Sequence, residues 1–397
     1  MNLKPSLLAV FIFTVSFTSF SQEIKSSKFG KGIVNLIGQD SSWAMKVGLR
    51  MQFQANGEWA NHQSPQSNFL IRRARLKFNG FAYSPRLKYK IELGLSNRDM
   101  SGANAFTDNA PRYIYDAYIK WNFYKNFELW AGQAKLPGNR ERVISSGNLQ
   151  LVDRSLLNRT FNIDRDLGFQ LRHHFNLTNH FVVREIFSFA QGEGRNVTTG
   201  NLGGYQYTGR IELLPFGNFT DDGDYFGGDL KREYTPKLSL ALSYDFNNNA
   251  VKTHGNMGNY METDKGFHET NISTLFIDTM FKYKGFSVLA EYANRNADMP
   301  LSVNSDGTLT GDVVQVGKGF NFQTGYLLDS NIEISGRYTY VKLDKTITGK
   351  EPENQYTLGV SKFLAGHKLK VQSDLSYLDI ANANGEVMFR VQFELHF

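Results

Sequence analysis

A short stretch of the chain, FLIRRARLKFNG at residues 69–80, concentrates positive charge on what reads as a β-strand. Ala74, Leu76 and Phe78 alternate with polar residues, and a period of two places them on one face of a strand. The opposite face then carries the side chains Arg73, Arg75, Lys77 and Asn79. Because a guanidinium stays charged at physiological pH and offers forked donors that match an oxyanion, this face is a candidate anion-binding surface.

The same alternation recurs along the whole chain and predicts about sixteen strands. At the C-terminus, EVMFRVQFELHF (386–397) alternates apolar with polar residues up to Phe397. The segments match the ~9–11 residues of a tilted membrane strand. They cover approximately 43–56, 68–80, 86–97, 112–123, 126–136, 165–176, 180–190, 204–214, 236–247, 272–284, 285–296, 318–328, 331–342, 354–363, 367–378 and 386–397.

The connections between these segments alternate between short turns and longer loops rich in Gly, Asn and Asp. That pattern is typical of a barrel with short periplasmic turns and long extracellular loops. The exception is 215–236, which should be a short turn and is not. A soluble β-sandwich is the alternative, but its strands average five or six residues. We therefore predict an all-β fold: a transmembrane antiparallel β-barrel of about 16 strands, wide enough for an aqueous channel.

The N-terminal residues predict export. Lys4, an apolar run over 7–20 and small residues before position 22 form a Sec signal peptide, with cleavage after Ser21. We expect residues 1–21 to be this signal, 22–42 a short periplasmic segment and 43–397 the barrel in a bacterial outer membrane. The chain has no cysteine, which excludes disulfides and thiolate metal sites. We predict no cofactor, no metal and no nucleic-acid partner.

Arg72 breaks the alternation of its strand. An arginine facing lipid at mid-bilayer costs about 2–4 kcal/mol, so we expect it at a strand end, in a bulge or at the rim. Arg73 and the basic residues that follow it should face the lumen, where Arg50 also points. Arg50, Arg75 and Lys77 are then a basic track along the pore wall. The alternative is a wall in which these cations pair with lumen acids such as Glu92, Asp116 and Asp245.

Three stretches carry a family resemblance: IRRARLKFNGFAYSPRLKYKIELGL (71–95), YIYDAYIKWNFYKNFELWAGQAKLPGNRERVISS (113–146) and NIDRDLGFQL (162–171). They resemble the phosphate-selective porin O and P family, and the likeness covers most of 43–397. It implies a sixteen-stranded trimeric porin with a third extracellular loop folded inward to form a narrow constriction. Position by position, it assigns this anion-binding constriction to Arg72, Arg73, Arg142, Arg154 and Asp116.

The loop between the fifth and sixth predicted strands fits this resemblance. Residues 137–164 form one of the longest connections and contain four arginines, and a loop of that length is usually functional or disordered. The chain departs from the family at Arg142, where phosphate-selecting members have lysine. This departure leaves a preference for anions in general. As a control region, we expect Lys370 and Arg390, on late strands, to lie away from the loop.

The leading hypothesis is an outer-membrane porin for passive diffusion of inorganic or small organic anions, with phosphate or polyphosphate as candidate substrates. A general or oligosaccharide porin is the alternative within transport. An outer-membrane enzyme or an adhesin is a remote alternative, and no catalytic constellation favours an enzyme. The expected partners are outer-membrane lipid, two further copies of the chain in a homotrimer, and the barrel assembly machinery, which would recognise Phe397.

Overall fold

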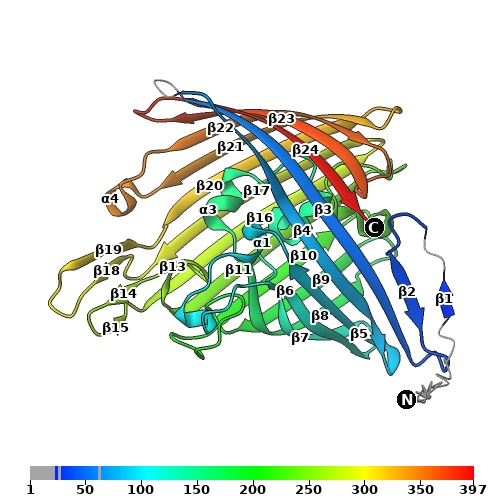
Figure 1. The fold of residues 1–397 in the computed structure, drawn as a ribbon, viewed down its shortest axis with the longest axis horizontal. Coiled ribbons are helices and arrows are strands. Elements are labelled where there is room, and N and C mark those ends of the chain that lie inside the picture. The colour runs from blue at the N-terminus through cyan, green and yellow to red at the C-terminus, as the bar shows by residue number, and fades with distance from the viewer. Residues whose placement is uncertain (1–22, 26–27, 61–63) are drawn as a thin grey trace, which may run out of the picture.

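The computed structural model describes residues 23–25, 28–60 and 64–397. Within them, sixteen antiparallel strands form a closed barrel, as predicted (Figure 1). Its strands are β3 (Trp43–Ala60), β4 (Gln66–Ala82), β5 (Ser84–Gly94), β6 (Ile114–Tyr124), β7 (Phe127–Lys135), β8 (Arg165–Asn176), β9 (Val182–Ala190), β10 (Gln206–Leu214), β11 (Lys237–Ala250), β16 (Thr270–Tyr283), β17 (Phe286–Ala297), β20 (Gly317–Leu327), β21 (Ile332–Leu343), β22 (Glu353–Phe363), β23 (Leu369–Ile380) and β24 (Glu386–His396).

The last strand closes the barrel on the first. β24 pairs antiparallel with β3 from Glu386↔Ala60 to His396↔Arg50, and the Phe397 amide donates to the Leu49 carbonyl at 2.9 Å. A short strand, β2 (Val34–Ile37), pairs with the part of β3 beyond the end of β24, and β1 (Glu23–Lys25) pairs with β2. Figure 1 shows β1, β2 and the C-terminal end of β24 at the same end of the barrel. The expected signal peptide, 1–21, lies outside the described residues.

The outer surface of the barrel is apolar and its inner surface polar. On β11, Leu240, Leu242 and Tyr244 are 43–52 % exposed, whereas Ser243 and Asp245 between and beside them are fully buried. A soluble protein would bury the apolar set. Here the exposed apolar band faces lipid and the polar set faces the lumen, as a membrane barrel requires.

Long connections gather at the end of the barrel opposite the C-terminus (Figure 1). They contain α1 (Asn97–Met100) and η1 (Ala105–Thr107) after β5, four hairpin strands after β11, one hairpin after β17, and α4 (Lys345–Thr348) after β21. The hairpin strands are β12 (Lys252–His254), β13 (Met257–Tyr260), β14 (Glu262–Thr263), β15 (Gly266–Phe267), β18 (Leu301–Val303) and β19 (Leu309–Val313). None of the helices in the described part of the chain is long and apolar enough to cross a bilayer.

The third extracellular loop, residues 136–164 between β7 and β8, folds into the barrel. It contains α2 (Arg140–Val143), η2 (Ser146–Asn148) and α3 (Leu156–Phe161). Leu157 and Phe161 of α3 are fully buried in a cluster with Phe276 and Ala293, which point inward from β16 and β17. This apolar packing holds α3 against β16 and β17, because moving the helix would expose the buried area to water.

Candidate functional site

A β-bulge in β4 turns two consecutive arginines toward the lumen. Gln52 of β3 pairs with Arg73, and the next residue, Phe53, pairs with Ile71, so Arg72 has no partner in the ladder. One extra residue in a strand reverses the parity of everything beyond it. Arg72 and Arg73 therefore both line the central cavity, while Ile71 stays on the lipid face at 55 % exposure.

Both arginines reach one carboxylate on the third loop. Arg72 Nη2 lies 2.9 Å from Asp153 Oδ2, and Arg73 Nη2 lies 3.6 Å from Asp153 Oδ1. Arg73 also donates to Gln52 Oε1 at 2.5 Å. The two guanidiniums hold the pKa of Asp153 well below its usual range, although burial alone would raise it. Two cations thus face a single anion, which leaves a net positive charge here.

Two further cations bond to the backbone of the third loop. Arg154 donates to the carbonyls of Glu141 and Ile144, both at 2.8 Å, and Lys135 donates to the carbonyl of Arg142 at 2.8 Å. Within the described residues neither Arg154 nor Lys135 forms an ion pair. Burial and the nearby Arg142 lower the pKa of Arg154 to about 9, so its guanidinium remains charged at neutral pH.

Arg142 and Asp116, in contrast, are each paired. Arg142 Nε donates to Asp164 Oδ1 at 2.8 Å. Asp116 accepts from Arg165 Nε at 2.6 Å and also contacts Lys90. Their side chains line the same cavity as Arg72 and Arg73. The structure therefore brings all five predicted constriction residues to one cavity, but only some of the cations are uncompensated.

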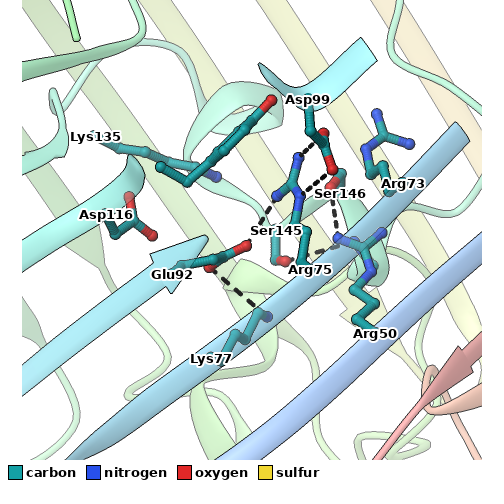
Figure 2. Close-up of polar contacts among 12 residues, drawn as sticks. Arg50, Arg73, Arg75, Lys77, Glu92, Asp99, Asp116, Lys135, Ser145 and Ser146 are labelled. Carbon is teal, nitrogen blue, oxygen red and sulfur yellow. Dashed lines mark hydrogen bonds and ion pairs between the residues drawn. The ribbon is translucent and has the colours of Figure 1, made fainter. Parts of the chain in front are cut away.

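The three residues of the predicted basic track are also paired (Figure 2). Arg75 lies between Glu92 at 2.9 Å and Asp99 at 2.8 Å, and Lys77 Nζ is 3.8 Å from Glu92. Arg50 bonds Glu394 of β24 at 2.5 Å and Ser146 of the third loop at 2.8 Å. At these positions the wall follows the alternative considered above, in which lumen cations pair with lumen acids.

The central cavity has a volume of about 1300 Å³ and an excess of positive charge. Its lining includes thirteen arginines and three lysines, against eight aspartates and glutamates. The cavity is lined by the third loop, by β4 to β10 and by β21, β22 and β24. In a low-dielectric channel such an excess raises the local concentration of anions.

Comparison with known proteins assigns the family. The profile described as phosphate-selective porin O and P matches residues 45–386. The chain belongs to this family. The porin is 23 % identical over 385 residues to an uncharacterized protein of Aquifex aeolicus, a match that covers 89 % of this chain and 87 % of the other.

Two solved structures show the same fold at low sequence identity. The anion-selective porin from Comamonas acidovorans has a TM-score of 0.55 at 11 % identity, covering 89 % of this chain and all of the other. OmpT of Vibrio cholerae in its trimer form has a TM-score of 0.50 at 12 % identity, covering 88 % and 99 %. The family and the fold together place this porin in a bacterial outer membrane.

A buried cluster of ion pairs around Arg140, which we call the latch, joins the third loop, the barrel wall and the long connection 215–236. Arg140 of α2 is fully buried and donates to Asp278 at 2.7 Å, Ser239 at 2.8 Å and Asp224 at 3.3 Å. Asp224 belongs to 215–236, which includes η3 (Thr220–Tyr225) and folds inside the porin instead of forming a short turn. The Gly227 amide also donates to the Asn148 carbonyl at 2.6 Å. Residues 215–236 thus support the third loop from the periplasmic side.

The expectation that Lys370 and Arg390 lie away from the third loop is wrong. Lys370 Nζ donates to the Leu149 carbonyl of that loop at 2.9 Å, and Arg390 pairs with Asp374 while lining the cavity. The loop extends across the lumen to β23. Its residues after α2 form hydrogen bonds with several of the late strands in turn. Val152, for example, donates its amide to Asp374 at 3.2 Å.

Two cavity residues were not predicted from the sequence: Lys135, the last residue of β7, and Arg165, the first of β8. Both flank the third loop and both line the cavity. Their position was a usable signal, because the bases of an inward-folded loop must lie at the lumen. Ser145, the N-cap of η2, and Ser146, its first residue, also line the cavity and were not predicted (Figure 2).

Proposed function

We propose that this porin is a passive, water-filled channel that favours anions, and that its constriction is formed by Arg72, Arg73, Arg142 and Arg154 with Asp116. The observation that carries the proposal is the local charge balance. Arg72 and Arg73 share one carboxylate, Asp153, and among the described residues Arg154 is bonded only to backbone carbonyls. Lys135 is likewise bonded to backbone carbonyls of the third loop.

The constriction acts by replacing part of an anion's hydration with guanidinium and ammonium donors. Each donor is already bonded to the protein, so its interaction with a passing anion stays weak enough for release. Arginine forks suit the oxygens of phosphate and polyphosphate, which makes these the anions to compare with chloride. The pairs Arg142–Asp164 and Asp116–Arg165 add no net charge, and we assign them to positioning the loop bases.

Arg50, Arg75 and Lys77 have a different role in this proposal. Their charges are matched by Glu394, Glu92 and Asp99 within 3.8 Å. They hold the wall and the neighbouring loops together, and they contribute little to the field that an anion meets. Removing one of them would leave a buried carboxylate uncompensated, which makes them unsuitable positions for changing selectivity alone.

The test is the reversal potential across a salt gradient in a planar bilayer. Changing Arg72, Arg73 and Arg154 together to Gln removes three positive charges from the lumen. Asp153 loses both arginine partners, but its side chain is 24 % exposed, so its charge is not left fully buried. The channel should lose its preference for anions or become selective for cations, because the negative charge of Asp153 then dominates the local electrostatic field. The matched control changes the exposed Lys265, Lys284 and Lys345 to Gln. It removes the same formal charge outside the cavity, and an equal shift in both variants would overturn the constriction.

A general porin is the second candidate function. The observation that favours it is that the three residues of the predicted basic track are paired with carboxylates. A wall with balanced charge does not distinguish anions from cations. In that case the wild-type reversal potential lies near zero and neutral oligosaccharides pass as readily as anions of the same size. A measurable single-channel conductance of either kind separates both porin functions from an adhesin or an enzyme.

We also propose the remaining features of the assembled protein. The mature chain begins after a signal peptide at 1–21, and 22–42 lies in the periplasm, where β2 extends the edge of β3. The barrel forms a homotrimer in outer-membrane lipid, supported by the family and by the trimer form of its structural neighbour. The assembly machinery recognises the strand that ends at Phe397.

A further inference from the structure

A second group of cations lies on the cavity wall away from the third loop. Lys120 of β6 and Arg172 of β8 flank Trp130 of β7, with Lys120 Nζ and Arg172 Cζ each 3.8 Å from the centre of the tryptophan ring. Tyr118 stacks on the same ring at 4.8 Å with an angle of 9°. All four side chains line the cavity. We name them the aromatic–cation stack.

The strand register explains why these side chains meet. Lys120 lies directly across from Trp130, and Tyr118 and Arg172 occupy diagonal positions on the two neighbouring strands. All have lumen parity, so their Cβ atoms project into the channel at neighbouring positions. β6 runs from the third-loop end at Asp116 toward the turn after Tyr124, which places the stack on the periplasmic side of the constriction.

The cations of the stack are only partly balanced by a carboxylate. In the described part of the chain neither Lys120 nor Arg172 forms an ion pair, whereas Lys90 nearby contacts both Glu92 and Asp116. Arg172 Nη2 donates to the neutral Gln170 at 2.8 Å, and its Nε lacks a hydrogen-bond partner. Glu128 of β7 lies directly across from Arg172, lines the same cavity and accepts from the Trp130 indole N–H. Two cations beside one carboxylate therefore leave a net positive charge for a mobile anion.

We propose that the aromatic–cation stack is a second binding site, selective for organic anions that carry a flat ring, such as aromatic carboxylates. The carboxylate of such an anion bonds Lys120 or Arg172. Its ring adds a further layer to the stack formed by Tyr118, Trp130 and the planar guanidinium of Arg172, since guanidiniums and aromatic rings stack face to face. An inorganic anion or an aliphatic carboxylate gains only the charge interaction.

This inference deepens the proposed function, because it names a substrate class for an anion channel. It differs in position and in chemistry from the constriction at the third loop. There the donors are held by carboxylates and backbone carbonyls, and here they rest on aromatic faces. An anion leaving the constriction toward the periplasm meets the stack next, so the two sites act in sequence.

The experiment compares two monocarboxylates of equal carbon number, benzoate and cyclohexanecarboxylate, as blockers of chloride current through single channels. Benzoate should reach half-block at an about two- to tenfold lower concentration, the range expected for one aromatic stacking contact. Trp130→Leu should remove the difference. Trp121→Leu is the matched control, because Trp121 belongs to the same strand as Lys120 but is 50 % exposed on the lipid face. Tyr118→Leu provides a second lumen variant.

Equal block by the two acids in the wild type, or a benzoate preference that survives in both Trp130→Leu and Tyr118→Leu, would overturn the proposal. Changing Lys120 and Arg172 to Gln should weaken block by both acids, and unchanged block would also overturn it. This experiment tests the stack independently of the proposed constriction. A wild-type channel without chloride-over-potassium preference but with Trp130-dependent benzoate block refutes the proposed constriction and retains the stack.

Discussion

The charges of the latch allow us to predict how much stability the porin loses when Arg140 is replaced. Three arginines, Arg140, Arg184 and Arg210, meet three acids, Glu212, Asp224 and Asp278, within 3.4 Å. Arg140→Gln leaves two cations for three buried carboxylates. Removing one partner of a buried charge pair typically costs about 3–5 kcal/mol, because the remaining charge is unpaired. We expect a loss of that order in the free energy of unfolding.

A compensating variant tests whether charge balance is the cause. Adding Asp224→Asn to Arg140→Gln restores equal numbers of cations and anions in the latch. The double variant should then be more stable than the sum of the two single effects by about 1–3 kcal/mol. Arg159→Gln is the control from the same loop. Arg159 is 62 % exposed and pairs with Glu353, so its loss should cost less than about 1 kcal/mol.

The assay is guanidinium unfolding of the refolded barrel in detergent micelles, with single-channel noise recorded in parallel. Arg140→Gln should lower the unfolding midpoint and increase current fluctuations, because the third loop loses its support from 215–236. Additive effects of Arg140→Gln and Asp224→Asn would refute the charge-balance argument. Wild-type stability and quiet currents in Arg140→Gln would refute the latch itself.

Three further predictions concern the loops and the ends of the chain. Burial raises the pKa of Glu193, in the loop between β9 and β10, to about 7 from a usual value of 4.5. The folded state therefore holds a proton that the unfolded state has lost, and the free energy of unfolding should fall as pH rises from about 4.5 to 7. Thermal unfolding across this range should show the fall, and a slope unchanged in Glu193→Gln would contradict it. Deleting Phe397 should reduce the heat-modifiable barrel in outer membranes while export continues, whereas Phe397→Tyr should assemble normally. N-terminal sequencing of the mature protein should begin at Gln22, and a chain that begins at Met1 would rule out the signal peptide.

The barrel could be predicted because its signal is local. Apolar and polar residues that alternate over ten or more positions indicate which face of a strand is apolar, and short turns indicate where strands end. The same alternation predicted that Arg72 lies in a bulge, at a strand end or at the rim, because an arginine side chain that faces lipid costs free energy. β16 shows what parity alone does not reveal. Its lumen face carries Phe276 and Met280, and these are apolar because the third loop and 215–236 cover them.

The pairing of the lumen charges could not be predicted from the sequence. Arg50 meets Glu394 because the barrel closes, and Arg75 meets Asp99 because α1 folds inward. Both partners are set by tertiary structure. The two arginines of α2 make the same point. Arg140 and Arg142 are two positions apart on one helical turn, so one points into the latch and the other toward the cavity.

The central claim is that the open part of this lumen has an excess of positive charge that selects anions. The most direct test is the reversal potential of the wild-type channel across a potassium chloride gradient in a neutral planar bilayer. The predicted result is a potential whose sign shows that chloride crosses more readily than potassium, with a magnitude that decreases as salt screens the lumen. A reversal potential at zero, or one of the opposite sign, would contradict the account.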